Sequence, residues 1–245
     1  MAIPAVATAQ VSTTTSATFS GAESEPDGSA EAYCGGAGQD ACTSGDPVQV
    51  SWGIGGSGQR SSLSFEPANA AGVGEFSLGT LTHDNTVVGP FNGITAVDFR
   101  VDTTVRDGDR SVEFSASHPT ELGVHEVIDS VRPCPYGGDS AGRCADAVSL
   151  PQPNASFPYV DGNVSYLLQI VGFRGPDGQT AQHTISPEGT PTEVQLMARL
   201  TKTPRLAADA VPTRPSMRVT RSPSMALPAG TAISPMRGGR CPGRR

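Results

Sequence analysis

Short segments in which apolar and polar residues alternate constrain the fold of this chain more than any other feature. Successive side chains of a strand point to opposite faces, so period-two alternation predicts strands with one buried face. Nine such segments follow one another: VQVSWG, SSLSF, EFSLGTL, ITAVDFRV, SVEFSAS, DAVSL, YLLQIVGF, AQHTIS and VQLMARL. Strands of this kind without helices between them predict an all-β antiparallel β-sandwich or jelly roll.

Composition agrees with many short strands joined by turns. The chain holds 29 Gly and 21 Pro among 245 residues, well above the average share of roughly 12%, which leaves little room for long helices. In ITAVDFRVD, Val97, Phe99 and Val101 share one parity and are expected to face the core, with the intervening charged residues in water. The one segment with weak helical character is TELGVHEVIDSV, residues 120–131.

The chain divides by composition into four parts. Residues 1–9 end in an Ala-x-Ala-like site and are interpreted as the remnant of a signal peptide. Residues 10–47 read as a loosely ordered Ser/Thr/Gly-rich leader, with one early strand expected at Val11 to Phe19, and residues 48–202 as the sandwich domain. Residues 203–245 lack either period and are predicted to be disordered. Their abrupt change in composition also suggests out-of-frame translation.

Charge is divided unevenly between the body and the tail. Residues 1–202 carry 9 basic and 23 acidic groups, a net −14, while residues 203–245 carry 8 arginines and one aspartate, a net +7. Clustered arginines suit phosphate, but the acidic body would repel a nucleic acid, so no nucleic-acid partner is predicted. No run of about 18 apolar residues occurs, so no transmembrane segment is predicted in the sequence as given.

The cysteines fall into two local pairs. Cys34 and Cys42 enclose seven residues, and Cys134 and Cys144 enclose nine, both glycine-rich. Two local disulfides are predicted, each stabilising the fold by about 2–3 kcal/mol in the chain-entropy model. Zinc is the alternative, although neither pair is CxxC and no histidine lies at ligand spacing. Disulfides predict a secreted or cell-surface, extracytoplasmic protein.

The stretch GTLTHDNTVV contains the best candidate for a site. His83, Asp84 and Asn85 could hold a hard cation, with calcium the ion considered and no other cofactor expected. Other oxygen ligands would have to come from elsewhere in the fold, the candidates being Glu121, Asp146 and Glu188. The simpler interpretation is a structural corner, in which His83 and Asn85 fix a turn by hydrogen bonds. Both interpretations stay open at this point.

Catalytic signatures are weak. No GxSxG elbow is present, and the stretch HPTELGVHE at 118–126 is not HExxH. Paired carboxylates for glycoside hydrolysis remain an alternative, because their separation is hidden in the sequence. Trp52 alternates with Val48 and Val50, which favours a core position over a sugar-stacking platform.

Five motifs in this order resemble the choice-of-anchor K domain of bacterial exported proteins. They are SWGIGGSGQRSSLSF at 51–65, LGTLTHDNTVV at 78–88, ITAVDF at 94–99, CPYGGDSAGRCADAVSL at 134–150 and VDGNVSYLLQIVGF at 160–173. The resemblance spans residues 48–202. It implies a secreted or surface-attached β-rich module without an established activity, joined to a variable C-terminal anchor. Its expected role is surface display, adhesion or extracellular structure, with cell-surface or extracellular polymers as partners.

The chain departs from the family's pattern at three points. Val87 and Val88 stand where the family has Pro-Ile, and the acidic segment expected before the cysteines is blurred in HPTELG. No LPxTG-like sorting signal is recognisable after the domain. Two other functions therefore stay open besides display: a secreted carbohydrate-active hydrolase and a calcium-stabilised glycan-binding module.

Overall fold

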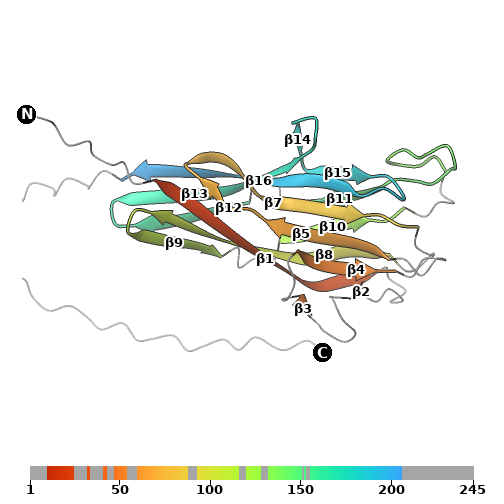
Figure 1. Cartoon of the computed structure of the whole chain (residues 1–245), viewed down its shortest axis with the longest axis horizontal. Helices are drawn as coiled ribbons and strands as arrows, with labels where there is room; N and C mark the ends of the chain where they lie inside the picture. Colours follow the sequence, from red (N-terminus) through yellow and green to blue (C-terminus); the bar gives the residue numbers. More distant parts are fainter. Residues whose placement is uncertain are drawn as a thin grey trace, which may run out of the picture. The chain divides into compact units, whose positions relative to one another are not determined.

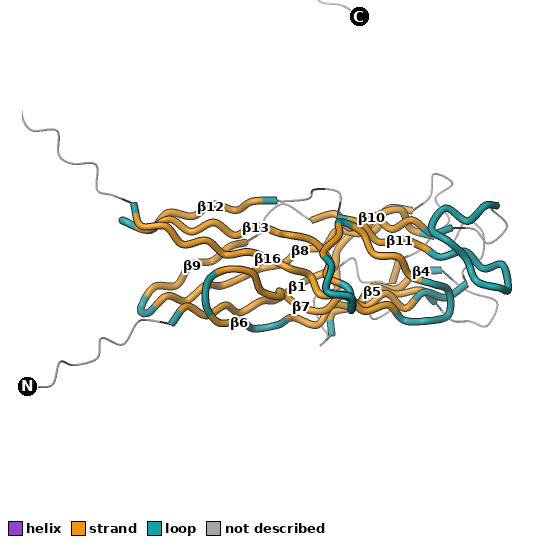
Figure 2. The backbone as a smooth tube through the Cα atoms, turned by 90° about the horizontal axis from the view of Figure 1, so that it is seen from above, coloured by secondary structure: helices purple, strands orange, loops and turns teal. Residues whose placement is uncertain are grey.

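The described residues of the computed structural model form β-strands and no helix (Figure 1, Figure 2). The described residues are 10–24, 32–33, 41–42, 47–53, 60–87, 93–115, 120–127, 132–150, 152 and 155–205. The predicted signal remnant at 1–9 and nearly all of the predicted tail at 203–245 lie outside them. The all-β antiparallel fold predicted from alternation is confirmed. No helix in the described ranges has the length and apolar character needed to span a membrane.

The first sheet is built around two long strands, β1 and β8. Its strand order is β15 (His183–Ser186), β11 (Asp146–Ser149), β10 (Thr120–His125), β8 (Ile94–Asp107), β1 (Val11–Ser24) and β3 (Ala41–Cys42). Two further strands lie off this path: β6 (Ala70–Ala71) pairs with β1, and β9 (Arg110–Ser115) pairs with β8. Every pairing is antiparallel.

The second sheet packs against the first. Its order is β12 (Ser156–Asp161), β13 (Val164–Arg174), β16 (Thr192–Pro204), β7 (Gly74–Asp84), β5 (Ser61–Pro67), β4 (Val48–Trp52) and β2 (Ala32–Tyr33), with β14 (Thr180–Ala181) beside β13. All of its pairings are antiparallel as well. Each of the nine segments identified by alternation lies on one or two of these strands.

Short Asp-Gly turns account for two of the hairpins. Asp107 pairs with Arg110, so that Gly108 and Asp109 alone join β8 to β9. Asp161 and Val164 close the β12–β13 hairpin in the same way. The first turn residue is glycine in both, with φ of 61° at Gly108 and 56° at Gly162. Two-residue hairpin turns of this type need positive φ, which glycine adopts without steric cost.

Aromatic side chains join the two sheets at the centre of the core. Phe99 on β8 lies directly opposite Phe19 on β1, with ring centroids 4.9 Å apart. The ring of Phe65, on β5 of the other sheet, meets Phe99 edge-on at 5.0 Å. All three are essentially without exposed surface. The predicted inward set of Val97, Phe99 and Val101 is confirmed.

Burial on β8 changes parity where its register shifts. Ile94 and Ala96 are also buried, although alternation assigned them to the outer face. A bulge on the neighbouring strand lies opposite Val97 and Asp98, between Ser20 and Ala22. A second register shift, between Glu23 and Ser24, leaves Thr95 of β8 as the extra residue, and an extra residue disrupts the alternation of the strand that carries it.

Two expectations are corrected. The sandwich begins at Val11 rather than at residue 48, because β1 pairs with β8 along its whole length and buries Val11, Ala17 and Phe19. The early strand expected at Val11 to Phe19 is confirmed as β1, which extends to Ser24 and is part of the first sheet rather than of a loosely ordered leader. The weak helical segment at 120–131 begins as strand β10 instead, since its backbone pairs with β8 and β11.

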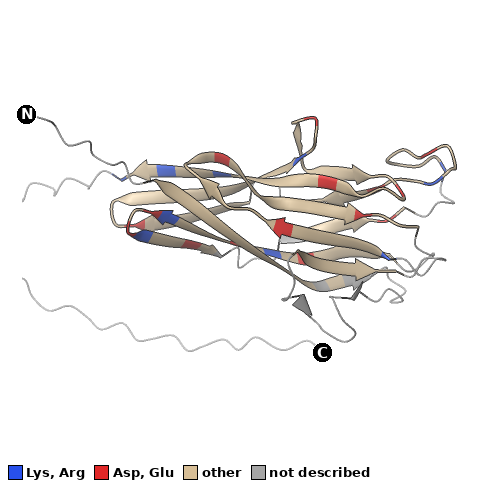
Figure 3. Ribbon diagram, viewed as in Figure 1, with Lys and Arg blue, Asp and Glu red and all other residues tan. Residues whose placement is uncertain are grey.

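Charged residues are spread along the strands and their ends in the view of Figure 3 rather than gathered on one face. Glu75 on β7 illustrates the pattern: it forms ion pairs with Arg199 on the neighbouring strand β16 and with Arg174 on β13, one strand further along the sheet. Hydrogen bonds from these arginines lower the pKa of the Glu75 carboxyl. Exposed pairs of this kind add little stability, typically below about 1 kcal/mol.

The role of β1 is open to a direct test. Phe19→Ala removes a ring enclosed between the sheets and should lower the free energy of unfolding by about 3–5 kcal/mol. Thr14→Ala changes an exposed position on the same strand and should cost less than about 0.5 kcal/mol. Urea denaturation of the full chain measures both. Equal, small effects would show that β1 does not belong to the cooperative core.

Candidate functional site

At one end of the core, the side chains that point inward from both sheets are polar or aromatic instead of aliphatic. On β7 the buried Leu81 is followed, at the next two inward positions, by His83 and Asn85. On β4, Val50 is followed by Trp52. All are almost completely buried, with 1% of His83 and none of Asn85 exposed. Alternation thus carries a histidine, an amide and an indole into the space between the sheets.

The opposite sheet supplies three carboxyl groups to the same end. Val124 of β10 pairs with Val148 of β11, and the inward positions one step further are Glu126 and Asp146. Ser186 of β15 lies directly opposite Asp146. Glu188 follows two residues after Ser186 and is 9% exposed. We call Glu126, Asp146 and Glu188 the acidic cluster.

Contacts across the gap join the acidic cluster to the other sheet. The indole Nε1 of Trp52 donates a hydrogen bond to Oε1 of Glu126 at 2.5 Å. Trp52 also stacks on the ring of His83, with centroids 5.7 Å apart. The backbone N–H of Val127 donates to Oδ1 of Asp146 at 2.6 Å. Trp52 is therefore a fully enclosed core residue and does not offer a sugar-stacking surface.

Asn85 ties the end of β7 to the segment that carries Glu188. The side-chain Nδ2 of Asn85 donates to the backbone carbonyl oxygen of Ser186 at 2.8 Å. The backbone carbonyl oxygen of Asn85 accepts from the N–H of Gly189, also at 2.8 Å. Oδ1 of Asn85 and Oγ of Ser186 are buried without a hydrogen-bond partner among the described residues. These contacts are of the kind that the predicted corner requires.

The acidic cluster perturbs its own ionisation. The pKa of Glu126 is raised well above its ordinary value, first by burial and then by the charge of Asp146. A hydrogen bond between these two carboxyl groups and the charge of Glu188 act in the same direction, while the Trp52 hydrogen bond opposes them. Two carboxyl groups can share a hydrogen bond only if one is protonated. Like charges brought together in the core thus favour a proton or a cation between them.

His83 contributes no positive charge to this balance. Burial lowers its pKa to about 4, so that the ring is neutral at physiological pH. Neither ring nitrogen has a hydrogen-bond partner among the described residues, and its contact is the stacked indole. The predicted corner role by hydrogen bonding therefore has visible contacts for Asn85 but not for His83.

At the opposite end of β8, Asp107 is a buried acid that has a basic partner. Asp107 is 8% exposed and accepts a hydrogen bond from the Tyr166 hydroxyl at 2.5 Å. Its carboxylate also forms an ion pair with Lys202 at 2.6 Å. These two hydrogen bonds, that of Lys202 first, lower the pKa of Asp107. A partner cation thus shifts the pKa of one buried acid in the direction opposite to that of Glu126.

The structure brings some of the candidate site residues together and leaves others apart or undescribed. His83 and Asn85, together with Asp146 and Glu188, come together at this end, while Asp84 points outward and is exposed. The side chain of Glu121 and all of His118 lie outside the described residues. Glu126 was missed, because the 118–126 stretch was compared only with a zinc motif. The sequence feature that points to Glu126 is the alternation of β10: Val124 faces inward, so Glu126, two residues later, is expected to face inward as well.

A disulfide-closed hairpin lies beside Glu188, with which it lines one pocket. Cys134 and Cys144 are bonded with their Cα atoms 5.2 Å apart, which confirms the second predicted pair. Cys34 and the side chain of Cys42 lie outside the described residues, so the first pair stays a prediction. Within the hairpin, Arg143 pairs with Asp139.

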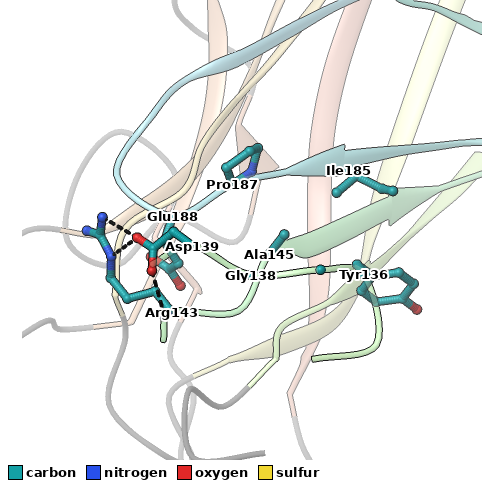
Figure 4. Close-up of a pocket in the computed structure, with 9 residues that line it drawn as sticks. Tyr136, Gly138, Asp139, Arg143, Ala145, Ile185, Pro187 and Glu188 are labelled. Atoms are coloured by element: carbon teal, nitrogen blue, oxygen red, sulfur yellow. Dashed lines mark hydrogen bonds and ion pairs between the residues drawn. The ribbon is translucent and has the colours of Figure 1, made fainter. Parts of the chain in front are cut away.

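A pocket of about 300 Å³ lies between this hairpin and the end of β15 (Figure 4). Figure 4 shows the Asp139–Arg143 pair at one side and Tyr136 at the other. Glu188 also lines the pocket, so one member of the acidic cluster borders an opening to solvent. The remaining lining near it is largely apolar and includes Ile185.

No three His, Cys, Asp or Glu side chains among the described residues are grouped as ligands of one metal ion. Comparison with protein-family models finds no match to this chain. Comparison with curated proteins finds none either.

The contact made by Asn85 predicts its contribution to stability. Asn85→Ala removes the hydrogen bond to Ser186 and leaves that carbonyl unsatisfied in the core, which should cost about 1–3 kcal/mol. Asp84→Ala, at the exposed neighbouring position, is the matched control and should change stability by less than about 0.5 kcal/mol. Urea denaturation measures both. If Asn85→Ala is as mild as its control, Asn85 does not hold the corner.

The pKa of His83 predicts a loss of stability in acid. The unfolded chain takes up a proton as pH falls below 6.5, whereas the folded ring stays neutral down to about 4. The stabilisation is therefore complete above pH 6.5 and falls by about 3 kcal/mol toward pH 4. His83→Phe keeps an aromatic ring and removes this titration.

Urea denaturation of both proteins between pH 4 and 8, in the absence of divalent cations, isolates the contribution of His83. The difference between the two profiles cancels the opposite contribution of Glu126, whose raised pKa favours the folded state in acid. Parallel profiles would contradict the assignment of a buried neutral histidine.

Proposed function

We propose that this chain is an exported, non-catalytic β-sandwich module of the choice-of-anchor K type, which serves in surface display, adhesion or extracellular structure. The observation that carries the proposal is that Asp146 is fully buried at the end of the core, with Glu188 largely buried and Glu126 partly buried beside it. Trp52 hydrogen-bonds one of them, and the Val127 backbone hydrogen-bonds another. Groups engaged in this way hold the two sheets together and are poorly placed to meet a large substrate.

The disulfide of the hairpin supports export. Structural disulfides persist in oxidising compartments and are rare in the cytosol. The Cys134–Cys144 bridge closes a hairpin that is also held by backbone hydrogen bonds and by the Asp139–Arg143 pair. Extracellular polymers are the proposed partners, as the resemblance implies.

A hydrolase with paired carboxylates is the second candidate, favoured by one observation. Glu188 borders the pocket, and Glu126 nearby has the raised pKa expected of a general acid. However, Glu126 and Asp146 occupy consecutive inward positions of the paired strands β10 and β11, close enough for Asp146 to raise the pKa of Glu126. Retaining glycosidases separate their carboxyl groups by about 5 Å or more, so that the glycosidic bond fits between them. This arrangement therefore favours the display module.

Fractionation of the producing bacterium tests the proposal. The chain should occur in the envelope or the medium, and Cys134 and Cys144 should resist thiol labelling until a reductant is added. Mass spectrometry of the labelled peptides measures the redox state of each cysteine. A cytoplasmic chain with both thiols reduced would contradict export.

Enzymatic activity is tested separately with the purified full chain. Incubation with a panel of glycosides and cell-wall polysaccharides should release no products. Turnover that is lost in Glu188→Gln and retained in Glu193→Gln, an exposed acid on β16, would instead establish the hydrolase.

A further inference from the structure

Oxygen atoms from both sheets converge at the polar end of the core. Three are carboxyl groups, contributed by the residue after β10, by β11 and by the segment after β15. The register of β10 with β11 puts Glu126 beside Asp146, and Asp146 lies opposite Ser186, two residues before Glu188. An acidic cluster alone does not define a site, so the neutral groups beside it decide what it can bind.

Ser186 provides the first neutral oxygen. It is fully buried, and its Oγ has no hydrogen-bond partner among the described residues. Because Ser186 pairs directly with Asp146, both side chains project to the same face of the sheet, with their Cβ atoms about 5 Å apart. The hydroxyl is thus directed into the acidic cluster. Buried hydroxyls without partners are rare and call for an explanation.

Asn85 provides the second neutral oxygen. Its amide is held at one end, because Nδ2 donates to the Ser186 carbonyl, and its backbone carbonyl accepts from Gly189, the neighbour of Glu188. Oδ1 is buried and has no partner among the described residues. Asn85 therefore lies beside both Ser186 and the Glu188 segment, with an acceptor oxygen still available.

We propose that the acidic cluster binds one divalent cation of the size of Ca²⁺ through the carboxylates of Glu126, Asp146 and Glu188. Oδ1 of Asn85 and Oγ of Ser186 complete the set. Calcium takes six to eight oxygen ligands, including carboxylates and amide carbonyls. Binding would draw together carboxylates that are not grouped as metal ligands in the described structure, which couples the cation to the packing of the two sheets.

The chemistry of this set points to a hard cation. All the proposed donors are oxygens, whereas zinc in structural sites takes sulfur and nitrogen ligands. The neighbouring His83 ring is neutral at physiological pH and does not repel a cation. This site does not depend on the proposed display function, since an extracellular enzyme could use the same cation for stability.

Thermal melting and calorimetric titration with CaCl₂ test the site on the full, oxidised chain after treatment with EDTA. At pH 7.5, the melting temperature should rise by about 3–8 °C in about 10 mM CaCl₂, if the affinity is that of extracellular modules, with Kd near 10⁻⁴–10⁻³ M. An equal ionic strength of NaCl should give no such rise.

Two variants remove one ligand each and preserve a structural hydrogen bond. Asp146→Asn keeps an oxygen to accept from Val127, and Glu126→Gln keeps one to accept from Trp52. Both should fold in EDTA, with melting temperatures at or above that of the unaltered chain, and both should lose the response to calcium. Glu193→Gln, an exposed acid outside the cluster, should keep the full response.

Two results would overturn the proposal. One is a melting temperature of the unaltered chain that does not change with CaCl₂, together with a more stable Glu126→Gln protein, which would show that a shared proton balances the cluster. The other is a calcium response that persists in both variants, which would place the binding elsewhere.

Discussion

The contact between Phe99 and the rings of Phe19 and Phe65 is the interaction on which the rest of the structure depends. It joins β8 to its neighbour β1 in one sheet and to β5 in the other. Each buried phenylalanine contributes about 1.5–3 kcal/mol of transfer free energy. Strand β8 itself carries Asp107 at one end of the core, and its neighbour β10 leads to Glu126 at the other, so this contact fixes the strand that relates the two ends.

The buried carboxyl groups at the two ends of the core have different partners. At one end, Asp107 receives a proton donor from Tyr166 and a cation from Lys202. At the other, three carboxyl groups come together beside a neutral histidine. A buried charge is costly unless it is paired, protonated or bound to a metal. The raised pKa of Glu126 and the lowered pKa of Asp107 are the opposite results of these two surroundings.

The stretch GTLTHDN links these features. Its apolar residues hold β7 in the centre of the second sheet, while His83 and Asn85 occupy the next inward positions and reach the acidic cluster. The same two residues were candidates for a structural corner and for a cation site. The two interpretations are compatible, because a residue that fastens β7 to the Ser186 carbonyl also presents an oxygen beside the carboxylates.

The sequence by itself determined the strands, the antiparallel class and the inward face of most segments, because a period of two follows from the geometry of a single strand. It also determined the Cys134–Cys144 pair, whose partners are close in the chain. It indicated an early strand at Val11 to Phe19 but not that this strand belongs to the sandwich, because the strand is rich in Ser and Thr and gains its place from pairing with β8. Nor did it single out Glu126. Only the tertiary structure decided which inward residues of distant strands meet, since register between strands and packing between sheets are set by contacts that no single segment contains.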